Sequence, residues 1–118
     1  MQVLVVDDQI DSLNLLTFVL EQEGANVTAV SSADAAIAFF HQSTPDLLIS
    51  DIGMPNSNGY SLIAQIRKLT SGRDLPAIAL TAYASEEDRQ RSLDCGFTKH
   101  IAKPINIADL ITTIVQII

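Results

Sequence analysis

The sequence of 118 residues predicts an α/β fold, in which helices cover both faces of a doubly wound, five-stranded parallel sheet. Two observations predict it. Short runs rich in valine, isoleucine and leucine alternate along the chain with stretches whose apolar residues recur at helical spacing. These runs are apolar at successive positions, which is typical of strands buried on both faces. We expect one domain over residues 1–118, because this length and a hydrophobic fraction of 47% suit a single core.

The predicted strands are short, and polar residues follow or end most of them. The first is dominated by valine and is followed directly by Asp7 and Asp8. The third is followed by Asp51, and the fourth ends at Thr81. In chain order, we expect strands at residues 2–6, 25–30, 46–50, 76–81 and 99–103.

Cap residues and apolar spacing predict helices between and after these strands. Ser32, Ser85 and Asn106 are residue types that cap helix N-termini. Gly24 and Gly96 are typical of the turn that follows a helix. In chain order, we expect helices at residues 10–23, 33–43, 60–69, 86–95 and 105–118.

Five polar residues are expected at one edge of the sheet. The carboxyl ends of parallel strands share an edge, and ligands of such sheets bind there. This edge would bring together Asp7, Asp8, Asp51, Thr81 and Lys103. Each residue taken singly has an ordinary structural explanation as a turn former, a helix cap or a strand residue. Their shared position favours a functional site.

The chemistry of these side chains indicates a phosphoryl group with a divalent cation. Clustered carboxylates repel one another, and Mg²⁺ relieves that repulsion because it prefers oxygen ligands. Lys103 suits a phosphate as a point charge, and Thr81 can donate a hydrogen bond to it. Asp51 is the best candidate for the nucleophile, because no cysteine or serine nucleophile is placed at this edge. The product would be an aspartyl phosphate.

With these residues in hand, the chain resembles the receiver domain of two-component response regulators. The resemblance extends from Val3 to about Ile114 and implies a flavodoxin-like strand order of 2-1-3-4-5. The motifs that carry it are "VVDD" at 5–8, "SDIGMPNSNG" at 50–59, "LTAYAS" at 80–85 and "KHIAKP" at 99–104.

The resemblance implies a phosphoacceptor and a metal site. Asp51 matches the residue that accepts the phosphoryl group. Asp8 would bind Mg²⁺ directly and Asp7 largely through water, with Asp51 and the backbone carbonyl of Gly53 as further ligands.

The resemblance also implies groups that hold the phosphate and respond to it. Lys103 would hold a phosphate oxygen, Thr81 would bond the phosphate and move toward it, and Ala82 would offer its backbone N–H. His100 matches the switch residue that swings inward with Thr81. The peptide bond between Lys103 and Pro104 would be cis.

Loop residues of the resemblance carry further expectations. Met54 and Pro55 fit the family's loop pattern, and Gly59 would serve a positive φ or a close approach at the next helix. Gly53 and Tyr83 stand where the family tunes the lifetime of the phosphate. Neither supplies an acid or amide side chain, so we expect autodephosphorylation that is not fast.

Partner classes follow from charge and from the resemblance. With 7 basic and 14 acidic residues, a net charge of −7 argues against direct nucleic-acid binding. The resemblance implies a histidine kinase or histidine phosphotransfer domain as phosphodonor. The face of the fourth helix, fifth strand and fifth helix would then control an output domain or partner protein. Such a domain catalyses its own phosphoryl transfer and autodephosphorylation without being a turnover enzyme.

Location and chain ends give further expectations. A single cysteine and no long apolar stretch indicate a cytoplasmic setting without membrane insertion. In the last helix, we expect Ile107, Leu110, Ile111, Ile114 and Val115 to face the core. The apolar end of the chain suggests that it was excised from a longer protein.

Three other functions compete with this interpretation. A pseudo-receiver would act only as a phosphorylation-independent binding module, but it would be expected to lack Asp51, Asp8 or Lys103. An aspartyl phosphohydrolase would need its nucleophile on the first strand and an acid two residues later. A flavodoxin-like electron carrier would need a phosphate loop in place of "DDQID" at 7–11, which would repel a phosphate.

Overall fold

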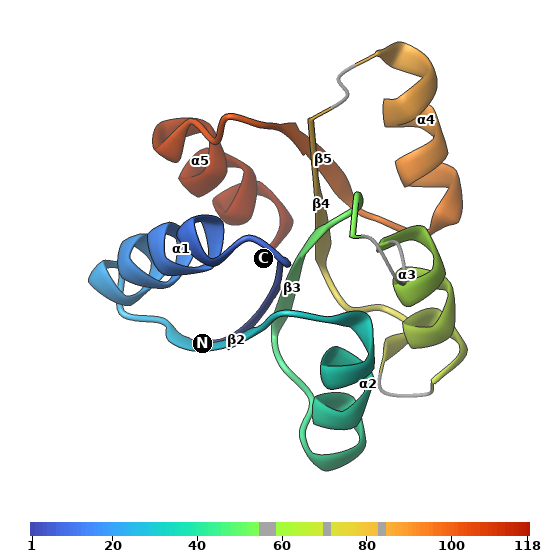
Figure 1. The fold of residues 1–118 in the computed structure, drawn as a ribbon, viewed down its shortest axis with the longest axis horizontal. Coiled ribbons are helices and arrows are strands. Elements are labelled where there is room, and N and C mark those ends of the chain that lie inside the picture. Colours follow the sequence, from blue (N-terminus) through green and yellow to red (C-terminus); the bar gives the residue numbers. More distant parts are fainter. Residues whose placement is uncertain (55–58, 70–71, 83–84) are drawn as a thin grey trace.

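The described residues, 1–54, 59–69, 72–82 and 85–118 of a computed structural model, form a parallel sheet of five strands in the order β2-β1-β3-β4-β5 (Figure 1). This confirms the predicted fold class and strand order. The strands are β1 (Gln2–Val6), β2 (Asn26–Val30), β3 (Leu47–Asp51), β4 (Ala77–Thr81) and β5 (Lys99–Ala102). The helices are α1 (Ile10–Gln22), α2 (Ala33–Gln42), α3 (Gly59–Lys68), α4 (Glu86–Cys95) and α5 (Ile107–Ile117).

Helices cover the sheet on both faces, with α1 and α5 on one side and α2, α3 and α4 on the other (Figure 1). Side chains of β4 alternate between two buried clusters. Ile78 and Leu80 pack with the α1 and α5 side chains, whereas Ala77 and Ala79 pack with those of α2 and α3. Both faces are therefore buried, as the continuous apolar runs predict.

Local hydrogen bonds fix the helix ends that the sequence predicts. The side chains of Ser32, Ser85 and Asn106 each accept a hydrogen bond from the backbone N–H three residues later, at 3.0–3.1 Å. Gly24 and Gly96 follow α1 and α4 with φ of 89° and 122°, a conformation that favours glycine. Helix α1 differs, because Gln9 precedes it without a side-chain cap.

Two expectations need correction. Asp51 is the last residue of β3, one residue beyond the expected range of 46–50, because the Ile52 N–H still donates to the Leu80 carbonyl at 3.0 Å. Ile107 and Val115 do not face the core: they are 45% and 69% exposed, whereas Leu110 and Ile114 are buried. Among the described residues, no helix has the length and apolar character needed to cross a membrane.

Candidate functional site

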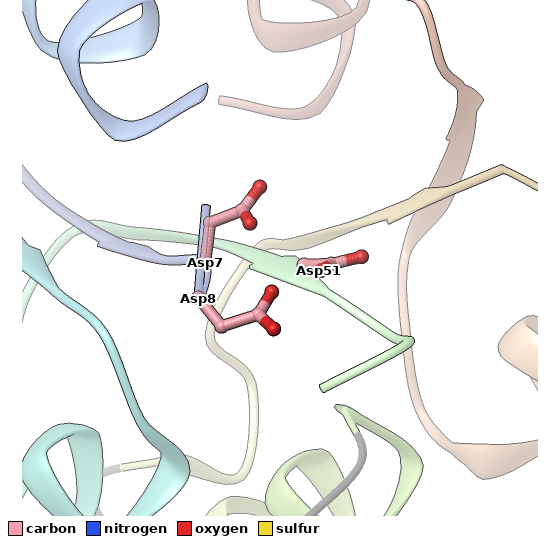
Figure 2. A group of neighbouring side chains, drawn as sticks. All are labelled: Asp7, Asp8 and Asp51. Carbon is pink, nitrogen blue, oxygen red and sulfur yellow. The ribbon is translucent and has the colours of Figure 1, made fainter. Parts of the chain in front are cut away.

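Three carboxylates meet at the carboxyl edge of the sheet (Figure 2). Asp7 and Asp8 follow β1, and Asp51 ends the neighbouring strand β3. Val6 of β1 lies opposite Ser50 of β3, so Asp7 and Asp51 are the next residues along the two neighbouring strands. One oxygen from each carboxylate lies within 4.8 Å of the others. The parallel register therefore produces the acidic cluster that the sequence predicts.

Lys103 reaches this cluster from the segment after β5. Its Nζ lies 2.9 Å from Asp7 Oδ2 and 3.6 Å from Asp51 Oδ1. Its backbone N–H donates to the Thr81 carbonyl at 2.7 Å, which fixes the start of the side chain beside β4. The Lys103–Pro104 peptide bond is cis, as expected. A single ammonium group thus faces two carboxylates.

Asp7 is fully buried, and both of its carboxylate oxygens accept a hydrogen bond. Its Oδ2 accepts from Lys103, and its Oδ1 accepts from the Gln9 N–H at 2.9 Å. Asp8 is exposed at the mouth of the site. A buried and an exposed carboxylate side by side leave oxygen atoms accessible from solvent, which suits a cation that keeps part of its water shell.

Burial raises the pKa of Asp51, and the charge of Asp7 raises it further. Lys103 and the Gly53 N–H, which donates to Asp51 Oδ1 at 3.3 Å, lower this pKa but do not cancel the rise. The three carboxylates of the cluster therefore outnumber its one ammonium group. Its ligand atoms are all oxygens, and a hard divalent cation such as Mg²⁺ fits both the donor set and the charge deficit.

The raised pKa predicts that Asp51→Asn stabilises the metal-free protein at neutral pH. Below the ordinary pKa of 3.8 the carboxyl is protonated in both the folded and the unfolded states and folding carries no penalty. As pH rises through 3.8 to the raised folded pKa, ionisation increasingly favours the unfolded state, and the variant escapes this loss. In thermal melts in EDTA between pH 4 and 8, the melting temperature of Asp51→Asn should exceed that of the wild type by an amount that grows with pH. A variant that melts at or below the wild-type temperature at pH 8 would contradict the prediction.

A cavity of about 640 Å³ opens beyond the carboxylates. It brings together six residues that the sequence places in one site: Asp8, Asp51, Gly53, Thr81, Ala82 and Lys103. Among the described residues that line it, sequence reasoning missed Gln9, Ile52, Tyr60, Asp88 and Arg91. Tyr60 lies on α3, and Asp88 and Arg91 lie on α4. The cavity therefore extends from the sheet edge to these two helices.

Gly59 sets how closely α3 approaches the end of β3. A Cβ atom at this position would lie 2.6 Å from the Asp51 carbonyl oxygen and 2.9 Å from the Ile52 Cα. The Gly59 N–H donates to the Ile52 carbonyl at 3.0 Å. Gly59 is not among the residues with positive φ, so the close approach, not the backbone conformation, accounts for the glycine.

His100 lies outside this cavity. It is half-buried on β5, opposite Ala79 in the strand pairing, and lines a groove with Asn106 and Asp109 beside α5. Its role as a switch stays a prediction. The expectations for Pro55 and Tyr83 concern positions outside the described residues.

Comparison with known proteins points to one family. The family model for the response regulator receiver domain matches residues 3–115. The chain is 47% identical over 116 residues to an uncharacterized 14.6 kDa protein in the sodA1 3' region of Leptolyngbya boryana, covering 98% of this chain and 88% of that protein.

Two further similar proteins are known regulators. The phosphate regulon transcriptional regulatory protein PhoB of Escherichia coli is 33% identical over 113 residues, and the match covers 96% of this chain but 49% of PhoB. The chain thus spans about half of that regulator. The structure of the chemotaxis response regulator CheY4 of Vibrio cholerae superimposes with a TM-score of 0.94 at 27% identity, covering 99% of this chain and 98% of CheY4.

Proposed function

The chain belongs to the response regulator receiver domain family, and from this premise we propose that Asp51 accepts a phosphoryl group from a phosphohistidine with the help of Mg²⁺. The family acts in two-component phosphorelay signalling. The observation that carries the proposal is the buried Asp51 carboxylate beside Lys103, at the floor of a cavity that also exposes Asp8.

The residues present fit the metal. Asp8, Asp51 and the Gly53 carbonyl would hold Mg²⁺, and Asp7 would contribute through water. When bound, the ion supplies positive charge that offsets the carboxylates and the phosphoryl oxygens.

In the transfer, one Asp51 oxygen attacks phosphorus and forms a new P–O bond. The P–N bond to the histidine breaks, and its electron pair returns to the imidazole nitrogen. Lys103, Thr81 and the Ala82 N–H would bind the phosphoryl oxygens as negative charge moves onto the domain. No group on this chain needs to give or take a proton in that step.

The added charge would act as the signal. Thr81 would move toward the phosphoryl group and His100 would follow, which shifts the surface of α4, β5 and α5. That surface would control an attached output domain or a separate partner protein. A histidine kinase or a histidine phosphotransfer domain would supply the phosphoryl group.

Intact-mass measurement after incubation with acetyl phosphate and Mg²⁺ tests this function. We expect the wild type and Asp34→Asn, an exposed aspartate on α2, to gain one phosphoryl group. Asp51→Asn should gain none, and EDTA should suppress the gain in the wild type and in Asp34→Asn. A wild type that stays unmodified would instead favour a pseudo-receiver that binds its partner without phosphorylation.

A further inference from the structure

The phosphoacceptor cavity has a second cationic wall, formed by α3 and α4. Arg91 of α4 and Tyr60 of α3 line the same cavity as Asp51 and Lys103. The Arg91 guanidinium carbon lies 4.3 Å from the centroid of the Tyr60 ring. The two helices lie side by side on one face of the sheet (Figure 1). A cation–π contact of this kind holds a long, exposed side chain in a defined place.

The charge of Lys103 is already shared with two carboxylates, whereas no carboxylate among the described residues pairs with Arg91. Lys103 is the other cationic residue among the cavity-lining residues that the structure describes, and it is bound to Asp7 and Asp51. Arg91 forms no ion pair within the described ranges. Asp88, which also lines the cavity, accepts a hydrogen bond from Ser85 Oγ at 2.7 Å.

Arg89, two residues earlier on α4, offers a contrast. Its guanidinium pairs with Glu86 at 3.5 Å, both side chains are largely exposed, and it is not among the residues that line the cavity. The two arginines therefore carry the same charge on the same helix, and only Arg91 directs it toward the place where a phosphodonor would enter.

We propose that Arg91 is a donor-binding residue that, among small phosphodonors, favours those of high negative charge, such as acyl phosphates. Tyr60 is its positioning residue. The inference rests on the proposed function, because it concerns the step that precedes transfer to Asp51. Carboxylates at the mouth repel an anionic donor, and a fixed guanidinium offsets that repulsion while offering paired N–H donors to phosphate oxygens.

The role of Arg91 is confined to binding. With acetyl phosphate, a P–O bond forms to Asp51, the P–O bond to the acyl group breaks, and acetate leaves with the electron pair. The leaving group departs as an anion, so Arg91 transfers no proton. Loss of Arg91 should therefore raise the donor concentration that gives half the maximal rate and leave the maximal rate unchanged.

Initial phosphorylation rates, followed by intact mass against donor concentration, test this role. For Arg91→Gln, we expect the half-saturating concentration of acetyl phosphate to rise about threefold to tenfold. For phosphoramidate, which carries less negative charge, we expect a change of less than about twofold. The half-saturating concentration of acetyl phosphate for Arg91→Lys should lie between those of the wild type and Arg91→Gln. Added salt should reduce the difference between the wild type and Arg91→Gln.

Two pairs of variants separate a specific role from a general one. Arg89→Gln removes the same charge from the same helix and should leave both donors unaffected. Tyr60→Phe keeps the ring and should behave as wild type. Tyr60→Leu should raise the half-saturating concentration of acetyl phosphate but not that of phosphoramidate. Equal effects of Arg89→Gln and Arg91→Gln, or a fall in maximal rate without a change in half-saturation, would overturn the proposal.

Binding of acetonylphosphonate, a non-transferable analogue, separates this inference from the proposed function. Calorimetry with Mg²⁺ should show weaker binding to Arg91→Gln than to the wild type. If the wild type binds the analogue more tightly than Arg91→Gln does but is never phosphorylated, the donor site is supported and the transfer to Asp51 is refuted. If the wild type is phosphorylated, and Arg91→Gln has the same affinity for the analogue and the same half-saturating acetyl phosphate concentration, only the donor site is refuted.

Discussion

Lys103→Met is expected to lower the free energy of unfolding by about 3–5 kcal/mol in the absence of Mg²⁺. Lys103 Nζ contacts Asp7, which is fully buried, and Asp51, which is nearly so. Without the ammonium, Asp7 keeps only the Gln9 N–H as a partner among the described residues, and the pKa of Asp51 loses a group that lowers it. Breaking a buried pair by removing one member leaves the other charge uncompensated.

The same change should slow phosphorylation of Asp51 about 100- to 1,000-fold, because a fixed positive group no longer meets the phosphoryl oxygens. Urea unfolding followed by circular dichroism measures the stability, and intact mass measures the rate. Lys99→Met is the matched control, since Lys99 is exposed on β5. Mg²⁺ should restore part of the stability but not the rate. A Lys103→Met protein as stable and as reactive as Lys99→Met would refute both expectations.

The acidic cluster was predictable because its position depends on one simple geometric rule. Asp7, Asp51 and Thr81 stand at or just after the ends of parallel strands, and parallel pairing brings these ends to one edge. Local chemistry also sufficed for the helix starts at Ser32 and Ser85, because a cap forms within three residues.

The Tyr60–Arg91 contact was not predictable in this way. The two residues lie within helices, so no strand end marks them, and their meeting depends on how α3 packs against α4. The exposure of Ile107 and Val115 could not be predicted from the sequence for a related reason. Apolar residues of α5 itself occupy most of the helix circumference, so the sequence pattern did not show which side of the helix packs on the sheet.

Arg67 is a further residue that sequence reasoning did not single out, and it joins three segments. From α3, its Nη1 donates to the carbonyls of Gly72 and Leu75 at 2.9 and 2.6 Å, with a weaker 3.4 Å contact to the Arg73 carbonyl. Its Nε and Nη2 donate to the Gly96 carbonyl at 3.0 and 2.7 Å, at the end of α4. Burial lowers the pKa of the guanidinium, but arginine starts so high that it stays charged.

Arg67→Met is therefore expected to cost about 3 kcal/mol of unfolding free energy. The partner carbonyls of Gly72, Leu75 and Gly96 would lose a donor in a partly buried place where water cannot fully replace it. Arg67→Lys should recover little, because one ammonium cannot bond to two loops on opposite sides as the planar guanidinium does. Lys68→Met, an exposed neighbour on the same helix, removes the same charge and should change stability by less than about 0.5 kcal/mol.

Urea unfolding at equal slope for all variants would make the three free energies directly comparable. Hydrogen exchange should also quicken in Arg67→Met at the Gly96 and Phe97 amides, because the turn that ends α4 would lose its tie to α3. Since this tie lies at the opposite end of α4 from Ser85, the start of that helix should keep its protection. Equal losses in Arg67→Met and Lys68→Met would show that charge, not the carbonyl contacts, sets the stability here.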